Sequence, residues 1–151
     1  MSYEYSEDNL VEAAAQQALE DLGWQVEYAW TKETFGDDGL LGREDKSEVI
    51  LKRYLLQALK QLNPNLPNVA YQHAIDQISE KAADKKLVQI NKEKCTLLTK
   101  GVDVSFTNDK GELVKKKLKV FDFENPTKNN FLAVRQLEVV GDLYNRRPDV
   151  V

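Results

Sequence analysis

Glu12 is the first of two carboxylates in this 151-residue chain whose positions suit chemistry. It lies in a predicted amphipathic helix, 9–22, in which apolar residues recur every three or four positions. At ~100° per residue, Glu12 falls ~100° from the centre of the apolar stripe, beside Leu19, whereas Glu20 falls ~180° away in solvent. A carboxylate at the stripe's edge can point along the surface into a cleft. Amphipathic helices often carry such glutamates, so a plain surface role is the alternative.

Asp149 is the second candidate, and it lies in the last residues of the sequence. Pro148 lacks an N–H and suits the first position of a strand, which would hold the following aspartate at a fixed height. Rigid placement is what a metal-binding carboxylate requires. Mg²⁺ prefers oxygen ligands and needs only one or two protein carboxylates. Pro-Asp pairs are common, and a structural role is the alternative.

Several other kinds of site are excluded by residue type. The sequence contains no G-x-x-x-x-G-K-[ST], no G-x-G-x-x-G and no H-E-x-x-H. One cysteine, Cys95, and one histidine, His73, cannot form an internal disulfide or a Cys/His zinc site. We expect Cys95 to pack in the core and His73 to be a surface or packing residue. The cysteine usage favours a reducing, cytoplasmic location.

Composition and charge argue against three further classes of protein. No run approaches ~18 apolar residues, so no membrane span is expected. The acidic first eight residues argue against a secretory signal peptide. The net charge of −4 argues against a free-standing, non-specific nucleic-acid binder.

Charge is unevenly distributed along the sequence. Residues 1–75 hold 6 Lys/Arg and 13 Asp/Glu, whereas residues 76–151 hold 15 and 12, which leaves room for a local anion contact in the second half. One candidate is a lysine patch, but lysines along a strand alternate faces, so a solvated edge strand is the preferred interpretation. Its members are Lys110, Lys115, Lys116, Lys117 and Lys119.

The predicted elements are helices in the first half and strands in the second. After the helix 9–22 and a strand at 25–30, two helices at 44–62 and about 67–83 form a helical insert, 44–83. A hairpin follows, with strands at 102–106 and 113–123, and then a strand at 131–140. We therefore predict an α+β fold (α/β in the broad sense). A mixed, mostly antiparallel sheet of about four strands is flanked by helices in a single domain, 1–151.

The last residues, 148–151, resemble the start of an apolar strand. Natural termini more often trail off in polar residues. We therefore expect that the sequence is the N-terminal part of a longer domain, divided after its Pro-Asp motif. A genuine C-terminal strand is the alternative.

Three motifs taken together resemble a known family. They are D-F-x-N-P at 122–126, N-N-F-x-x-x-x-Q at 129–136 and R-R-P-D at 146–149, preceded by the Glu12 helix with its D-L-G-W ending at 21–24. In this order they resemble the N-terminal nuclease region of the HsdR restriction subunit of type I restriction-modification enzymes. The resemblance covers nearly the whole chain, and the combination is more specific than any one motif.

The resemblance implies the incomplete first part of a PD-(D/E)-x-K nuclease fold. Asp149 would be the Pro-Asp aspartate and Glu12 the acidic residue of the leading helix, and both would be catalytic and bind Mg²⁺. Gln136 and Arg147 fall in the matching motifs and are candidate DNA contacts. The sequence ends at Val151, before the family's E-x-K and its ATP-using motor. We therefore expect the fragment alone to be inactive.

The parent protein, by the same resemblance, is an ATP-dependent, DNA-translocating type I site-specific deoxyribonuclease that cleaves unmodified DNA. Its partners are DNA and the modification (M) and specificity (S) subunits. The alternative is a non-catalytic subunit-interaction module with the same scaffold, which docks through the helices of 44–83. Exposed apolar residues on those helices favour the module. A shared cleft for Glu12 and Asp149 favours the nuclease.

Overall fold

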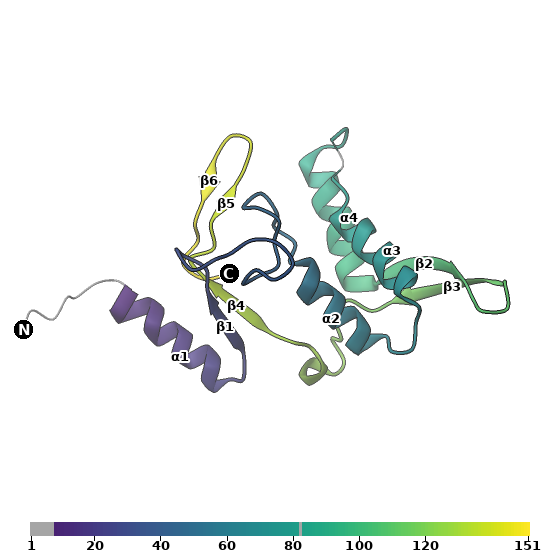
Figure 1. Cartoon of the computed structure of the whole chain (residues 1–151), viewed down its shortest axis with the longest axis horizontal. Coiled ribbons are helices and arrows are strands. Elements are labelled where there is room, and N and C mark those ends of the chain that lie inside the picture. The colour runs from purple at the N-terminus through teal and green to yellow at the C-terminus, as the bar shows by residue number, and fades with distance from the viewer. Residues whose placement is uncertain (1–7, 82) are drawn as a thin grey trace, which may run out of the picture. The chain divides into compact units, whose positions relative to one another are not determined.

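The chain is described by a computed structural model over residues 8–81 and 83–151 (Figure 1). These residues form two compact units. Unit 1 joins the described residues up to Leu51 to Asn130–Val151, and unit 2 is Lys52–Asn129. The predicted helical insert, 44–83, overlaps the start of unit 2.

Unit 1 is built around a parallel pair of strands. A short π-helical turn, Asp8–Glu12, leads into α1, Ala13–Asp21, and Gly23 (φ +84°) then turns the chain into β1, Gln25–Tyr28. β1 pairs in parallel with β4, Leu132–Arg135. The last residues pair antiparallel with the other edge of β4, where Val134 and Val151 exchange hydrogen bonds of 2.8 and 2.9 Å. The predicted first helix, the following strand and the extended terminal segment are thus confirmed.

The buried face of the first helix differs from the predicted one. Leu10 and Val11 belong to the apolar repeat of the predicted helix 9–22, whose residues were expected to face inward. They are 57% and 61% exposed, whereas Glu12 is only 8% exposed. The face directed inward carries Glu12, Ala15, Gln16 and Leu19, which have the i, i+3, i+4, i+7 spacing of one helical face. The predicted stripe was wrong by about one residue step, ~100°. Glu12 therefore lies on the covered face rather than at its edge.

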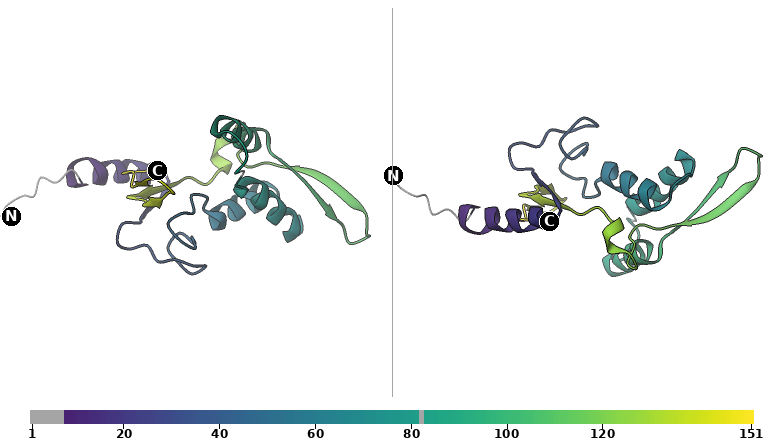
Figure 2. Two further views of the ribbon diagram at one scale, coloured as in Figure 1. Left: turned by 90° about the horizontal axis from the view of Figure 1, so that it is seen from above. Right: turned by 90° about the horizontal axis from the view of Figure 1, so that it is seen from below.

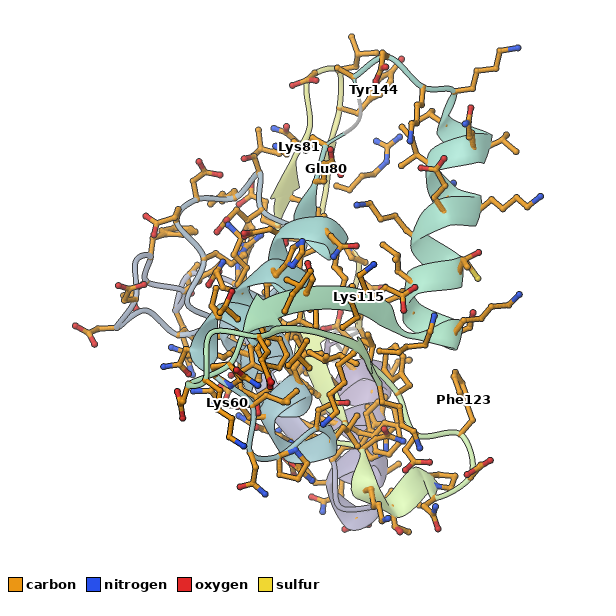
Figure 3. All side chains as sticks on the ribbon, turned by 90° about the vertical axis from the view of Figure 1, so that its right-hand side faces the viewer. Lys60, Glu80, Lys81, Lys115, Phe123 and Tyr144 are labelled. Atoms are coloured by element: carbon orange, nitrogen blue, oxygen red, sulfur yellow. The ribbon has the colours of Figure 1, made fainter. Side chains whose placement is uncertain are left out.

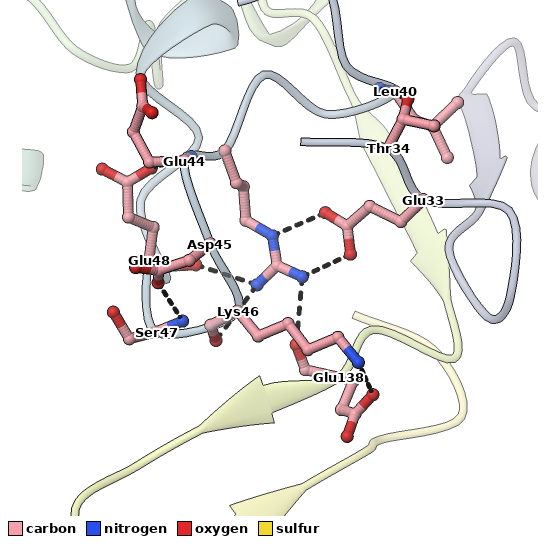
Figure 4. A network of polar contacts seen from close by, with 10 residues as sticks. Glu33, Thr34, Leu40, Glu44, Asp45, Lys46, Ser47, Glu48 and Glu138 are labelled. Carbon is pink, nitrogen blue, oxygen red and sulfur yellow. Dashed lines mark hydrogen bonds and ion pairs between the residues drawn. The ribbon is translucent and has the colours of Figure 1, made fainter. Parts of the chain in front are cut away.

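The segment between β1 and α2 is held by a buried arginine (Figure 4). Arg43 is 1% exposed and forms a two-point ion pair with Glu33, at 2.7 and 2.5 Å. It also donates to the carbonyls of Glu48 and Glu138, both at 3.0 Å. The predicted helix 44–62 begins only at Lys52, because these contacts and local side-chain bonds to the backbone of 44–48 replace helical hydrogen bonds.

Unit 2 packs three helices with a hairpin. The helices are α2 (Lys52–Leu62), α3 (Asn68–Ser79) and α4 (Leu87–Lys100), and the antiparallel strands are β2 (Val102–Thr107) and β3 (Leu113–Leu118). Figure 2 shows the hairpin as a long twisted ribbon. Every second residue of β2 is buried, and so are the residues on one face of α3. These are the spacings at which side chains share one face of a strand and one face of a helix. The predicted helix at about 67–83 thus corresponds to α3, and its apolar residues Ala70, Ala74, Ile75 and Ile78 are buried.

α4 was not predicted. None of its described side chains is fully buried, and its first two residues, Leu87 and Val88, are 77% and 80% exposed. Its half-buried residues lie on one face that a lysine interrupts, so the apolar period is weak and the helix was missed. These residues are Ile90, Lys94, Leu97 and Leu98. Cys95 lies on this helix and is exposed, so the expected core role was wrong. His73, on α3, is at the surface as expected.

The lysines of β3 divide between the two faces of the hairpin. Lys115 and Lys117 pair across from Ser105 and Asp103, whereas Lys116 pairs across from the buried Val104. Figure 3 shows Lys115 on this hairpin. Lys117 also forms an exposed ion pair with Asp103 at 3.1 Å. The predicted alternation of these lysines between the two faces is confirmed.

The fold is a mixed α+β fold, as predicted. Within the described residues, the strands form three two-stranded sheets, β1–β4, β2–β3 and β5–β6, rather than one sheet of about four strands. β5, Val139–Val140, and β6, Asn145–Arg146, are the short antiparallel pair. The predicted strand 131–140 is divided into β4 and β5. No helix in the described part of the chain has the length and apolarity needed to cross a bilayer.

Candidate functional site

The site begins where β4 ends. Gln136 has a left-handed backbone, with φ of +54°, which interrupts the strand. In a regular strand, neighbouring side chains point to opposite faces. Here the side chains of Arg135 and Gln136 both contact Glu12. The break in the strand therefore directs two adjacent residues at one carboxylate.

Gln136 joins the two predicted site carboxylates. Its side-chain Nε2 donates to Glu12 Oε1 at 2.6 Å and to Asp149 Oδ1 at 3.2 Å. Its backbone N–H donates to the Asp149 carbonyl at 2.9 Å. Three sequence-predicted site residues, from the first helix, the end of β4 and the terminal segment, are therefore in direct contact. Glu12 is buried and Asp149 is exposed, so the pair is open to solvent on the Asp149 side.

Arg135 holds the other oxygen of Glu12. Its Nη2 lies 3.2 Å from Glu12 Oε2, and Nη1 donates to Gln16 Oε1 at 2.7 Å. The guanidinium also lies over the Tyr28 ring, 5.2 Å from its centroid. Burying a carboxylate is costly unless it is paired and hydrogen-bonded, and Arg135 supplies the pairing. The sequence analysis missed this residue, although a charged residue within the apolar run 131–140 was an available signal.

The donor set suits a hard divalent cation. Two carboxylates from different elements converge on one amide nitrogen, and Mg²⁺ takes oxygen ligands and commonly only one or two carboxylates. With a cation between the carboxylates, rotation of the terminal amide would present its oxygen in place of its nitrogen. Among the residues that the structure describes, no group of three or more His, Cys, Asp or Glu side chains gathers as a fuller metal site.

Arg147, the fourth predicted residue, contacts none of the other three. Its guanidinium lies 3.6 Å from the centroid of the Trp30 ring. Trp30 follows β1, and the preceding residue, Ala29, donates its N–H to the Arg135 carbonyl at 2.9 Å. The stacking partner was missed because the two residues are distant in sequence.

The D-F-x-N-P motif has a local structural role in unit 2. Asp122 Oδ1 accepts hydrogen bonds from the backbone N–H groups of Glu124 and Asn125, at 3.2 and 3.0 Å, and Asn129 closes the turn onto the Asp122 backbone. The N–H of Asn125 is the main reason that the pKa of Asp122 lies below its ordinary value of 3.8; Lys119 acts in the same direction, and desolvation opposes both. This motif thus organises a turn.

Comparisons with known proteins agree with these motifs. The family described as "Type I restriction enzyme R protein N terminus" matches residues 4–151. The HindI endonuclease subunit of a type I restriction enzyme from Haemophilus influenzae is 33% identical over 148 residues, which cover 95% of this chain and 13% of the relative. A Methanocaldococcus jannaschii protein, provisionally named the MjaIXP endonuclease subunit, is 30% identical over 149 residues, which cover 97% of this chain and 14% of the relative. No solved structure matches the chain.

Proposed function

Because the chain belongs to the family of type I restriction enzyme R protein N termini, we propose that it is the first part of a Mg²⁺-dependent DNA nuclease domain. Glu12 and Asp149 are the proposed metal ligands. The observation that carries the proposal is the Gln136 amide, which bonds both carboxylates at once, at 2.6 and 3.2 Å. One oxygen of each carboxylate thus lies within hydrogen-bond distance of the same nitrogen, which supports the proposal that the two share one cation.

The two carboxylates differ in burial and in their hydrogen-bond partners, and this difference suits a shared metal site. Arg135 fixes one oxygen of the buried Glu12 and leaves the other directed at Gln136. Asp149 is exposed, so a phosphodiester can approach from its side. Bound Mg²⁺ would supply a nucleophile from water and stabilise charge on the phosphate. The residues of this chain provide the fixed oxygen donors and the open face.

The proposal covers only part of the catalytic apparatus. The chain spans 13% and 14% of the two relatives, and the family's E-x-K would follow Asp149 in the parent protein. We propose that these 151 residues alone do not cleave DNA. The parent would be a cytoplasmic, ATP-dependent translocating endonuclease that acts on unmodified DNA with M and S subunits.

The experiment uses the complete R subunit, assembled with its M and S subunits, on circular DNA that carries an unmodified site. Asp149→Asn and Glu12→Gln should each abolish Mg²⁺-dependent cleavage while ATP hydrolysis continues. Asp142→Asn, an equal change of charge at an exposed residue of the same unit, should cleave normally. Cleavage that persists in both site variants would remove these residues from the mechanism.

The interaction-module alternative has less support. The inner residues of α3 are buried within unit 2 rather than left free for a partner. Among the described residues of α2 and α3, Val69 is the large apolar side chain that is well exposed, at 58%. The link from Glu12 through the Gln136 amide to Asp149 is the observation that supports the nuclease proposal. Gln136 would have to release one carboxylate before its amide could contact DNA.

A further inference from the structure

Among the residues that the structure describes, three of the six cations of unit 1 form ion pairs with carboxylates, and three do not. Unit 1 holds 6 Lys/Arg and 16 Asp/Glu. Arg43, Arg135 and Lys46 are each ion-paired with a glutamate. The other three each lie over an aromatic ring, with centroid distances of 5.5, 5.1 and 3.6 Å. These pairs are Lys32 on Tyr28, Arg146 on Tyr144 and Arg147 on Trp30.

Arg147 is the most closely stacked of the three. A 3.6 Å separation from the ring centroid places the planar guanidinium directly on the indole face. Within the described residues, its N–H groups make no hydrogen bond or ion pair, although acidic side chains greatly outnumber cations in this unit. Arg147 is exposed and Trp30 is 38% exposed, so the guanidinium edge remains accessible. The stack thus orients a fork of N–H donors without using them.

Short segments of chain join this fork to the residues that carry and hold the two carboxylates. Only Pro148, whose ring fixes φ, separates Arg147 from Asp149. Trp30 follows Ala29, which bonds the Arg135 carbonyl immediately before Gln136. Both halves of the stack are therefore tied by short segments to the residues that hold Glu12 and Asp149.

We propose that Arg147, oriented on Trp30, binds a phosphodiester of the DNA backbone beside Glu12 and Asp149. The inference rests on the proposed nuclease function and adds the residue that places its substrate. An oriented guanidinium matches two phosphate oxygens with parallel N–H bonds, which an ammonium cannot do. An acidic site that acts on a polyanion needs such a local cation to offset repulsion between the carboxylates and the phosphate.

The test uses the 151-residue chain and a labelled duplex oligonucleotide without divalent cations. Arg147→Gln should bind the DNA at least about tenfold more weakly than the wild-type chain, because it loses a pair of charged hydrogen bonds. Arg147→Lys should show an intermediate loss, since charge remains but the fork does not. Arg146→Gln is the matched control, one residue away with the same change of charge, and should weaken binding less than about threefold, as expected for a diffuse charge effect.

A second measurement follows the Arg147 Nε–H resonance by NMR. The indole ring current should shift it upfield in the free chain, Trp30→Leu should remove that shift, and DNA should move the resonance. The inference is overturned if Arg147→Gln and Arg146→Gln lose equal DNA affinity, or if only Trp30→Leu weakens DNA binding. It is also overturned if the wild-type chain binds no DNA at protein concentrations up to about 1 mM, which is above the usual range of non-specific dissociation constants. Cation binding by Glu12 and Asp149 is measured separately, so either proposal can fail while the other stands.

Discussion

Replacing Arg135 by methionine tests the electrostatic support of the site. Methionine fills much of the arginine stem but removes the charge from Glu12. The side chains of Arg135 and Glu12 are only 9% and 10% exposed, so the change leaves a carboxylate buried without its cation. Removing one partner of a buried ion pair typically costs about 3–5 kcal/mol. Because Gln136 still donates to Glu12, we expect the lower end, about 3 kcal/mol.

A double-mutant cycle separates this cost from lost packing. Glu12→Gln keeps the side-chain shape and removes the charge, so we expect a loss of about 1–2 kcal/mol. Once Glu12 is neutral, Arg135→Met no longer strands a charge. The double variant should therefore be more stable than the sum of the single changes by about 1.5–3 kcal/mol.

The assay is urea unfolding followed by tryptophan fluorescence. Trp24 and Trp30 both belong to unit 1, so the signal reports the unit that holds the site. Lys32→Met is the control, because it removes a cation from the same Tyr28 ring without stranding a carboxylate. That variant should lose less than about 0.5 kcal/mol. A loss below about 1 kcal/mol for Arg135→Met, or additive effects in the cycle, would refute the proposed support.

Three further predictions concern backbone strain, a close approach and pH. Gln136→Ala should be about 1 kcal/mol less stable than Gln136→Gly, because both lose the amide bridge but only alanine keeps the left-handed penalty at φ +54°; equal urea midpoints would contradict this. Gly101→Ala should cost at least about 2 kcal/mol, because its Cβ would lie 2.7 Å from a β3 carbonyl at φ +91°, whereas Gly111→Ala, at φ +80° with nothing within 4 Å, should cost only about 1 kcal/mol; circular dichroism melts rank the two. Asp122 has a folded pKa below 3.8, so its contribution to stability is present above that pH and is lost as the pH falls through the lower folded value. Asp122→Asn should flatten this acid limb in unfolding curves measured by circular dichroism, and an unchanged limb would assign it to other groups.

Local patterns predicted the elements whose faces are buried against a partner. Val102, Val104 and Phe106 alternate because β2 packs on α3, so the sequence period reports the structure directly. α4 was missed because a lysine interrupts its half-buried face and weakens the apolar period. The segment 44–51 was wrongly predicted as helix. Its conformation depends on the hydrogen bond from Arg43 to the distant Glu138 carbonyl, and local hydrophobic periodicity carries no information about such a contact.

The site was predicted in part. Glu12, Gln136 and Asp149 were all named from the sequence, and the structure brings them into contact. The predicted helix face was nevertheless wrong for Glu12, whose burial depends on the ion pair with Arg135. The left-handed turn at Gln136 was also unpredictable from residue type, because glutamine rarely adopts positive φ. Tertiary contacts set both features.

Cation binding by the 151-residue chain tests the central claim most directly. Mn²⁺, used as a paramagnetic substitute for Mg²⁺, should broaden the NMR signals of residues around Glu12, Gln136 and Asp149 in the wild-type chain. Glu12→Gln and Asp149→Asn should each weaken that binding at least about tenfold, as loss of a charged ligand implies, and Asp142→Asn should leave it unchanged. Binding that is absent from the wild-type chain, or equal in all four proteins, would contradict a metal site formed by this carboxylate pair.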